Sequence, residues 1–265
     1  MKIGIAGCAG RMGRVLLCEV DAHPATKLAG GSVMAEDSHA GEDIGLIGRL
    51  TARKIFAVTD PAALFETVDG VIDFTRPEAS LEMARIAAAK GKVHIIGTTG
   101  FTEAQLAQLK QYADRATIVW SPNMSVSVNM FMSLVEQTAR VLDPEYDIEI
   151  LEMHHKHKVD APSGTALALG EAAARGRAIS LKDHSVRVRD GHTGERRSGD
   201  IGFATLRGGD VVGEHTVMFA GEGERLELTH KSTTRDIYAR GAIRAALWAN
   251  KQQPGFYSMK DVLGL

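Results

Sequence analysis

The first half of the chain alternates short apolar runs with segments of helical periodicity. The apolar runs predict β-strands at residues 2–6, 27–33, 70–74, 92–96 and 116–120. The segments between them predict helices at residues 11–20, 60–66, 77–90 and 102–112. Because strands that alternate with helices are joined by right-handed crossovers, the pattern predicts a mostly parallel, Rossmann-like α/β sheet.

The second half has a different pattern. A helix is predicted at residues 129–142, and residues 146–153 alternate as a half-buried strand does. Strand-like runs, among them V-R-V-R, F-A-T-L-R and T-V-M-F-A, follow between residues 185 and 229, and a last helix is predicted at 236–249. We therefore expect a Rossmann-like domain (1–123 and 234–265) and a smaller α+β domain with an open mixed sheet (124–233).

Composition and charge narrow the class of protein. The 265 residues carry a net charge of −2, which predicts no attraction to nucleic acid or to an anionic membrane. No apolar run reaches the roughly 18 residues of a membrane span, and the first residues do not resemble a signal peptide. The two cysteines, Cys8 and Cys18, form no disulfide framework, so a reducing, cytoplasmic location is expected.

A glycine-rich loop follows the first predicted strand. It reads Gly7-Cys8-Ala9-Gly10-Arg11-Met12-Gly13 and leads into a helix, which is the context that a dinucleotide-binding turn needs. Gly10 would let a pyrophosphate approach the backbone, and the helix N-terminus would favour its charge. The spacing is G-x-x-G-x-x-G rather than G-x-G-x-x-G, and a tight turn without a ligand is the alternative.

Three other segments bear on the cofactor. The acid expected at the end of the second strand is missing, because that strand ends in Ser32-Val33-Met34, and Glu36 and Asp37 come slightly late. The sequence therefore predicts NADH or NADPH without a preference. The loops 97–100 (G-T-T-G) and 121–125 (S-P-N-M-S) follow later strands, at the edge where ligands bind in such sheets.

The segment E-M-H-H-K-H-K-V-D-A-P-S-G-T-A, residues 152–166, holds three of the ten histidines. If the strand continues, alternation places His155 and His157 on one side and His154 on the other. Two lysines oppose a cation, and no cysteine or acidic cluster completes a zinc site, so no metal is expected. A solvated strand end is the alternative that needs no ligand.

The same segment suits an anion. Lys156 and Lys158 offer ammonium donors to carboxylates. Ser163, Gly164 and Thr165 stand where a new helix should begin, and hydroxyl and N–H groups there favour an anion. A histidine, with an ordinary pKa near ~6.5, is suited to proton transfer at neutral pH. Together with a nicotinamide cofactor, these groups predict hydride and proton delivery to a small anionic substrate.

At these residues the sequence resembles the dihydrodipicolinate reductases (4-hydroxy-tetrahydrodipicolinate reductases) of bacterial lysine biosynthesis. The resemblance covers nearly the whole chain. Its most specific element is the 152–166 motif. The motifs that agree with it are the opening glycine loop, F-T-x-P at residues 74–77, G-T-T-G at residues 97–100 and the tail M-K-D-V-L at residues 259–263.

The resemblance implies an activity and a set of roles. The family reduces a cyclic dicarboxylic imine to tetrahydrodipicolinate with NAD(P)H, in a Rossmann-like domain completed by the C-terminal helix. Its second domain binds substrate and builds a homotetramer through its sheet. By motif, His154 would be the proton donor and Lys158 the second catalytic group. The substrate carboxylates would contact His155, Lys158, Ser163, Gly164 and Thr165.

The cofactor positions are carried over in the same way. They are Gly7, Cys8, Ala9, Gly10, Arg11, Met12, Gly97, Thr98, Thr99, Ser121, Pro122, Asn123 and Met124. Val33 and Met34 stand where family members often have an acid followed by a base, which leaves the cofactor preference open. The alternatives are another Rossmann reductase of an amino-acid pathway, a dinucleotide-binding sensor without turnover, and a zinc-binding structural domain.

Overall fold

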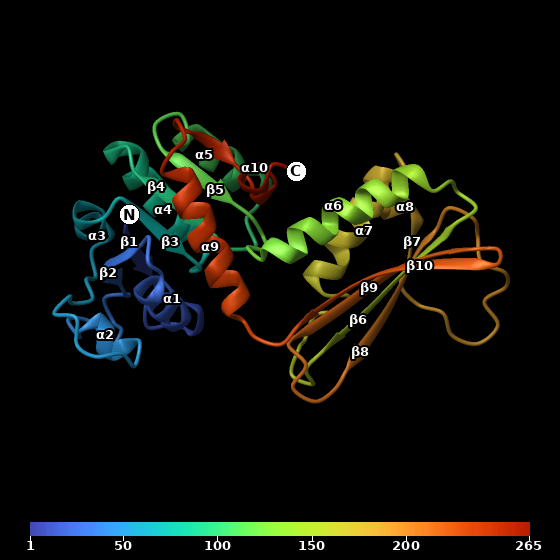
Figure 1. Ribbon diagram of the computed structural model, residues 1–265, viewed down its shortest axis with the longest axis horizontal. Helices are drawn as coiled ribbons and strands as arrows, with labels where there is room; N and C mark the ends of the chain where they lie inside the picture. The colour runs from blue at the N-terminus through green and yellow to red at the C-terminus, as the bar shows by residue number, and fades with distance from the viewer. The chain divides into compact units, whose positions relative to one another are not determined.

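The computed structural model describes all residues, 1–265, and the chain divides into two compact units. Unit 1 comprises residues 1–126 and 236–265, and unit 2 comprises residues 127–235. None of the helices is long and apolar enough to cross a membrane. Each unit has a sheet and a core of its own (Figure 1).

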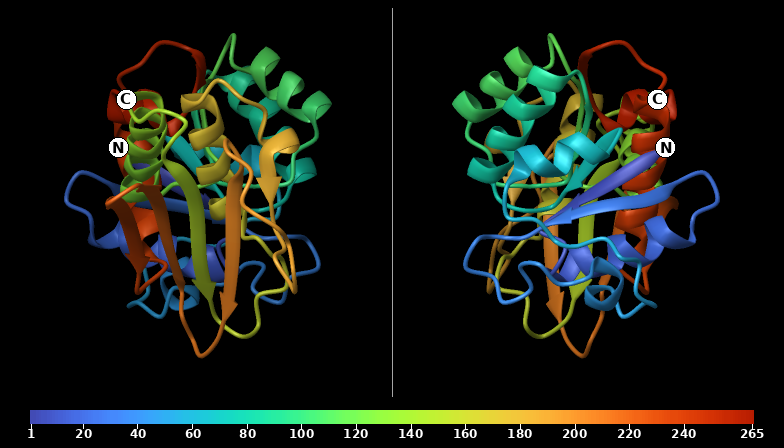
Figure 2. Two further views of the ribbon diagram at one scale, coloured as in Figure 1. Left: turned by 90° about the vertical axis from the view of Figure 1, so that its right-hand side faces the viewer. Right: turned by 90° about the vertical axis from the view of Figure 1, so that its left-hand side faces the viewer.

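Unit 1 is built on a six-stranded sheet in which every pair of neighbouring strands is parallel. The strands are β1 (Lys2–Ala6), β2 (Lys27–Ser32), β3 (Gly70–Asp73), β4 (Val93–Ile96), β5 (Thr117–Trp120) and β11 (Gly255–Tyr257). Their order is β11-β5-β4-β3-β1-β2. The predicted parallel α/β sheet is confirmed. The right-hand view of Figure 2 shows β1 and β2 side by side in blue.

Helices cover both faces of this sheet. They are α1 (Arg11–Ala22), α2 (Ile44–Ile47), α3 (Pro61–Thr67), α4 (Pro77–Lys90), α5 (Glu103–Tyr112), α9 (Asp236–Ala249) and α10 (Met259–Leu263). Apolar residues of α1 and α9 join those of the strands in one core, and α3, α4 and α5 form a second core on the other face. Strands buried on both faces explain the continuous apolar runs of the sequence.

Two helices of this unit begin at side-chain caps. Asp60 caps α3, because its carboxylate accepts a hydrogen bond from the Ala62 N–H at 2.9 Å. Thr102 and Gln105 form a capping box at α5. The short elements α2, β11 and α10 were not predicted. β11 has three residues, and its position beside β5 comes from a return of the chain after α9.

Unit 2 carries a five-stranded sheet of mixed direction. Its strands are β6 (Asp147–His154), β7 (Ser185–Val186), β8 (Ile201–Arg207), β9 (Gly213–Gly221) and β10 (Glu224–Ser232), in the order β10-β9-β6-β8-β7. The central strand β6 pairs antiparallel with β9 and parallel with β8. The left-hand view of Figure 2 shows β6 in yellow-green at the middle of this sheet. The predicted mixed sheet is confirmed.

One face of the unit 2 sheet packs against helices. These are α6 (Val126–Val141), α7 (Gly164–Gly176) and the short α8 (Leu181–His184), which lie on the same side of the sheet in Figure 1. Alternate residues of β6 face them, so that Ile148 and Ile150 are buried in the core of unit 2. Leu151 and Met153 point to the other face and stay half-exposed. This alternation determines which side chains reach the site at the end of β6.

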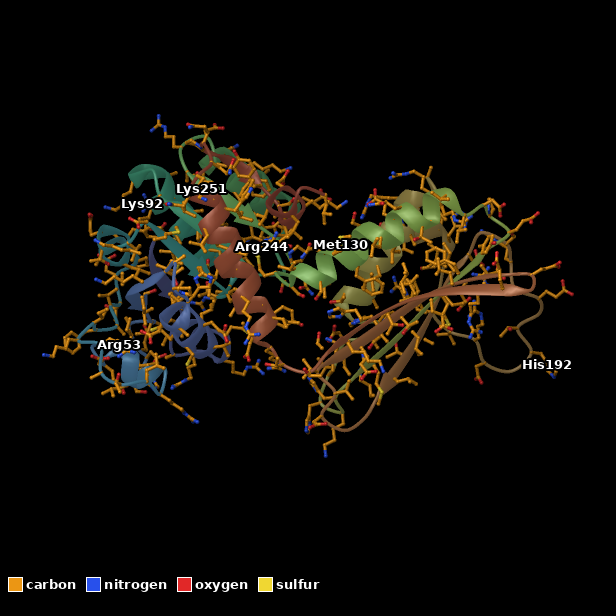
Figure 3. The ribbon with its side chains drawn as sticks, in the orientation of Figure 1. Arg53, Lys92, Met130, His192, Arg244 and Lys251 are labelled. Atoms are coloured by element: carbon orange, nitrogen blue, oxygen red, sulfur yellow. The ribbon has the colours of Figure 1, made fainter.

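One strand prediction in this unit is wrong in extent. Of the V-R-V-R run only Val186 is in β7, and residues 187–200 form a loop. Arg189 and Arg196 of this loop instead bind the carboxylate of Glu149, with distances of 2.8 to 3.0 Å. The loop carries His192 away from the sheet (Figure 3), so this histidine takes no part in the site of the other histidines.

Candidate active site

The last residue of β6, His154, is paired with a carboxylate. Glu152 and His154 lie two residues apart on one strand, so their side chains point to the same face. The Nδ1 atom of His154 is 2.6 Å from Oε2 of Glu152, and both side chains are buried. Since an ionised carboxylate only accepts hydrogen bonds, Nδ1 carries the hydrogen of this contact. The other ring nitrogen, Nε2, is left as the atom that gains or loses a proton.

The Glu152 carboxylate is bound from two further sides. Arg207, the last residue of β8, donates two hydrogen bonds to it, Nη1 to Oε2 at 2.8 Å and Nη2 to Oε1 at 2.9 Å. The backbone N–H of Ser163 donates a third at 2.9 Å to Oε1. A buried carboxylate needs such partners to remain charged. Glu152 therefore lies at the junction of β6, β8 and the turn before α7.

Burial and charge act in opposite directions on this pair. Burial by itself would raise the pKa of Glu152, but the hydrogen bonds from Arg207, His154 and Ser163 outweigh it and lower that pKa below its ordinary value. Burial lowers the pKa of His154, and the attraction of Glu152 opposes this effect without cancelling it. The free protein thus holds Glu152 ionised and His154 mainly neutral at neutral pH.

A second histidine packs against the first. The ring of His215, on β9, meets the His154 ring edge to face with 5.1 Å between centroids. Burial, helped by the nearby His154, lowers the pKa of His215 to about 4, so that this ring is neutral at neutral pH. Its Nε2 is 3.0 Å from the hydroxyl of Ser163. A neutral imidazole accepts that hydroxyl hydrogen bond and adds no charge beside His154.

The N-terminus of α7 adjoins these residues. Ser163 is its N-cap, and the hydroxyl oxygen accepts from the Ala166 N–H at 3.1 Å. Ser163 is buried, whereas Gly164 at the first helical position is exposed. The unsatisfied first-turn amides of a helix carry partial positive charge. Because the Ser163 N–H also donates to the Glu152 carboxylate, an anion held at this turn would lie close to the Glu152–His154 pair.

The lysines and the other histidines lie beyond the strand. β6 ends at His154, and residues 156 and 157 form a turn, so the alternation predicted past His154 is wrong. Lys156 and His157 are exposed, and Lys158 pairs with Asp160 at 2.8 Å. The His155 and His157 rings lie 6.2 Å apart, separate from the His154–His215 pair. The chain bend, rather than alternation, separates these two histidines from His154.

No group of three or more His, Cys, Asp or Glu side chains is arranged to hold a metal ion. Glu152 lies beside His154, but both of its carboxylate oxygens accept hydrogen bonds from the guanidinium of Arg207. The chemistry that this arrangement supports is proton transfer beside an anion.

The glycine loop in unit 1 is shaped for a close ligand. Gly7 has a φ of +62°, and a Cβ atom at Gly13 would collide with the carbonyl oxygen of Gly7. Gly10 is the N-cap of α1 and offers no side chain to its first amides. Helix α1 therefore starts with an uncapped N-terminus directly after β1, which fits the pyrophosphate of a dinucleotide. Ala9, Arg11 and Met12 border this turn, whereas Cys8 is fully buried.

Val33 and Met34, the two positions where cofactor preference is expected to be set, follow the end of β2 and differ in exposure. Val33 is 7% exposed and belongs to the core, but Met34 is 56% exposed. The late acid Asp37 accepts hydrogen bonds from the backbone and the ring of His39, at 2.9 and 2.8 Å. These bonds lower the pKa of Asp37. Of the two selectivity positions, only Met34 presents its side chain outward.

The other cofactor positions follow β4 and β5. A buried carboxylate, Asp73, accepts from the hydroxyl of Thr75 at 2.6 Å and lies 3.2 Å from the ring of His94. Thr98 is buried; its hydroxyl accepts a hydrogen bond from Ser80 and donates one to Asp73. Thr99, the next residue of this loop, is exposed. The indole N–H of Trp120 donates to the Thr98 carbonyl at 3.1 Å.

The loop after β5 is closed by its own polar groups. The Ser121 hydroxyl donates to the carbonyl of Asn123 at 2.8 Å, and the Asn123 side chain accepts from the Ser125 N–H. Pro122 is exposed, Asn123 is half-buried and Met124 is buried. The predicted cofactor residues thus lie in loops or, for Arg11 and Met12, in the first turn of α1, all after carboxyl ends of strands of one sheet, where open α/β sheets bind their ligands.

Family models match both parts of the chain. The model "Dihydrodipicolinate reductase, N-terminus" matches residues 1–124, and "Dihydrodipicolinate reductase, C-terminus" matches residues 127–263. The chain belongs to the dihydrodipicolinate reductase family.

Several relatives of this reductase family are similar over their full length. The 4-hydroxy-tetrahydrodipicolinate reductase of Methylocella silvestris is 53% identical and covers 100% of this chain and 97% of its own. That of Brucella abortus is 52% identical, with 100% and 99% covered. A solved dihydrodipicolinate reductase of Paenisporosarcina sp. TG-14, with dipicolinate bound, has a TM-score of 0.78 at 23% identity, over 97% of both chains. This likeness shows that the two share a fold.

Two residues beside His154 were missed in the sequence. Arg207 and His215 enter the site because β8 and β9 flank β6, with His154 opposite Arg207 and Glu152 opposite His215. Neither pairing can be read from the order of residues. The link from Glu152 to His154 could have been found, because the two-residue spacing in an alternating strand places both on one face.

Proposed function

We propose that this reductase delivers a hydride from NADH or NADPH and a proton from His154 to the ring of 4-hydroxy-tetrahydrodipicolinate, whose hydroxyl group leaves as water, giving tetrahydrodipicolinate and the oxidised cofactor. The relatives at 52–53% identity are named for this substrate. The observation that carries the assignment of the proton is the His154–Glu152 contact of 2.6 Å at the end of β6. It leaves Nε2 of His154 as the atom that can take up and give away a proton, close to the N-terminus of α7.

Unit 1 holds the cofactor in this proposal. The pyrophosphate would lie on the uncapped N-terminus of α1, within the turn formed by Gly7 and Gly10. The loops 97–99 and 121–124 would line the nicotinamide half, since both follow strands of the same sheet edge. When bound, the nicotinamide supplies the hydride.

Unit 2 holds the two substrate carboxylates. Lys158 supplies an ammonium group for one of them. In the free protein the Nζ atom of Lys158 pairs with the carboxylate of Asp160 at 2.8 Å, and a substrate carboxylate would take the same kind of contact. The first turn of α7, with Gly164 and Thr165, supplies backbone N–H groups for the other. His155 borders the same segment, and Ser163 acts by capping the helix rather than by exposing its hydroxyl.

The proton donor has to be charged when the substrate is bound. Burial lowers the pKa of His154 in the free protein. A dicarboxylate beside it places negative charge in the site, which favours the imidazolium and raises that pKa. Substrate binding thus loads Nε2 with the proton that is then transferred. Lys158 stabilises the negative charge that develops before this transfer.

A homotetramer is part of the same proposal. The sheet face of unit 2 that points away from α6 and α7 carries half-exposed apolar side chains, including Leu151 and Met153, and Leu206 is 48% exposed. A face of this kind is typical of a surface that is covered by further copies of the chain. Light scattering should give four times the 28.4 kDa of one chain, and a monomer mass would refute this part of the proposal.

A coupled assay tests the proposed reaction. The unstable substrate is generated from pyruvate and aspartate semialdehyde by the upstream synthase, and oxidation of NADH and NADPH is followed separately at 340 nm. We expect oxidation that depends on the synthase and on both of its substrates. Tight binding of NADH or NADPH without oxidation would indicate a sensor and would contradict the proposal.

A further inference from the structure

The carboxylate of Glu152 connects the proton donor with two other parts of unit 2. We propose that Glu152 and Arg207 are positioning residues, which orient His154, set how readily it takes up a proton, and link it to the turn before α7. This inference rests on the proposed role of His154. Neither residue is assigned to bind substrate or cofactor; both act through the donor.

The first step in the argument is the fixed orientation of the ring. Glu152 binds Nδ1 at 2.6 Å, and the His215 ring packs against the imidazole at 5.1 Å between centroids. A Cβ atom at residue 213 would lie 3.0 Å from Nε2, so Gly213 leaves room beside that nitrogen. With Nδ1 held by the carboxylate, a flip of the ring would break a buried charge-assisted hydrogen bond. Nε2 is thereby kept as the proton-transferring atom.

The second step is the balance of charge around His154. Glu152 favours the imidazolium, whereas the positive charges of Lys158 and Arg207 disfavour it. His215 is the remaining titratable group that faces the ring, and it stays neutral because burial holds its pKa near 4. Arg207 binds both oxygens of Glu152 and so withdraws part of the negative charge that His154 would otherwise receive. The two residues therefore act on the donor in opposite directions.

The third step is the link to the substrate-binding segment. The Ser163 N–H donates to Oε1 of Glu152 at 2.9 Å, which fixes the start of α7 relative to the donor. Nη2 of Arg207 also donates to the carbonyl of Asp160 at 2.6 Å, and Asp160 pairs with Lys158. One carboxylate and one guanidinium thus hold the proton donor, the anion-binding turn and the catalytic lysine in one network.

A second glutamate of β6 provides a matched control. Glu149 is bound by Arg189 with two hydrogen bonds of 2.8 Å and by Arg196 at 3.0 Å, and its pKa is lowered as that of Glu152 is. It lies on the other face of the strand and contacts no histidine. Replacing Glu149 therefore breaks an ion pair of the same kind in the same strand without touching the donor.

The test compares Glu152→Gln, Arg207→Ala and Glu149→Gln. The titration of His154 is followed by NMR of protein labelled with ¹³C in histidine, and its signal is assigned by its loss in His154→Gln. The pH profile of kcat/KM is recorded on the same proteins. Loss of the carboxylate charge should move the His154 titration, and the limb where activity falls as pH rises, to lower pH. Loss of the guanidinium should move both to higher pH.

Turnover provides the second readout. In Glu152→Gln the amide can donate to Nδ1 and leave a neutral ring with its hydrogen on Nε2, which is a poor acid. We expect kcat to fall at least about tenfold, as for other histidines that lose an orienting carboxylate. The KM should change less, because the amide oxygen still accepts from the Ser163 N–H. Glu149→Gln should keep kcat within about twofold.

The outcome separates this inference from the proposed reaction. Opposite shifts in the two site variants, with lower kcat in Glu152→Gln, support the positioning roles. Shifts in the same direction, no shift in either variant, or an equal loss in Glu149→Gln would overturn them. Turnover of His154→Gln tests the donor role by itself, so that failure of the one proposal can be told from failure of the other.

Discussion

Nδ1 of His154 lies 2.6 Å from Oε2 of Glu152, on the same face of the central strand of unit 2. The contact gives each ring nitrogen a different role, since one is held by the carboxylate and the other is left for proton transfer. Around this pair, Lys158 and the first turn of α7 provide the groups that suit a dicarboxylate.

Lys158→Ala should weaken the binding of dipicolinate, a stable planar dicarboxylate that serves as the probe, by about tenfold to a hundredfold. The reason is the loss of a charge-assisted hydrogen bond to one carboxylate. Isothermal titration calorimetry measures the affinity, and kinetics should show a lower kcat together with a higher KM. The matched control is Lys156→Ala, because Lys156 is exposed and its backbone N–H is bound to the Gly209 carbonyl. Equal losses in both variants would point to a general attraction of charge and against a role of Lys158 in the site.

Met34→Arg should raise the preference for NADPH over NADH, on the order of tenfold in the ratio of kcat/KM values. Met34 is 56% exposed at the end of β2, so a guanidinium there can reach a 2′-phosphate without disturbing the core. Val33 is 7% exposed, and a charge at that position would be buried instead. Val141→Arg, at an 82% exposed residue of unit 2, adds the same charge elsewhere. An unchanged ratio in Met34→Arg would show that the ribose lies away from the end of β2.

Acidification should destabilise unit 2 between pH 6.5 and 4. His215 has a pKa of about 4 in the folded chain and an ordinary value of 6.5 when unfolded, so the unfolded chain binds more protons as the pH falls through this window. The contribution of the neutral His215 ring to the free energy of unfolding is fully present above pH 6.5. By pH 4 the free energy of unfolding has fallen by about 3 kcal/mol through this group. Burial also lowers the pKa values of His154 and His230, which adds in the same direction.

Hydrogen exchange of the β6 and β9 amides, measured at pH 7 and pH 4.5 and corrected for intrinsic rates, checks this prediction. His215→Gln keeps an acceptor for the Ser163 hydroxyl and removes the titrating group. It should lose clearly less protection on acidification than the natural chain. The groups that face His215 are His154, Glu152, His230 and Lys158, and all are unchanged in this variant. An identical loss in both proteins would contradict the role of His215.

Most helices and strands could be predicted from local sequence patterns. Apolar runs and capping residues are properties of short stretches of chain, and they placed β1, α3, α5 and α9 within a residue or two of their ends. β11 could not be predicted in the same way. Its three residues are assigned to the sheet by pairing with β5, which depends on the return of the chain after α9. The two-residue β7 was overestimated because alternating valines and arginines also suit a loop whose arginines form ion pairs.

The residues of the site also differ in whether the sequence could reveal them. The motif at residues 152–166 contains His154, the lysines and the helix start, because these are neighbours in sequence. Arg207 and His215 come from other strands, and only the register of β6 with β8 and β9 brings them beside Glu152 and His154. Strand alternation failed beyond His154 because the chain turns there, and a periodicity argument holds only as far as the strand does.

The donor role of His154 is tested most directly by the turnover of His154→Gln. Glutamine keeps a polar side chain of similar size, and His157→Gln, at an exposed histidine of the same segment, serves as the control. The coupled assay should give a kcat lower by about 10²–10⁴-fold for His154→Gln, with little change in KM and with near-natural activity for His157→Gln. A kcat of His154→Gln close to that of the natural chain would contradict the account.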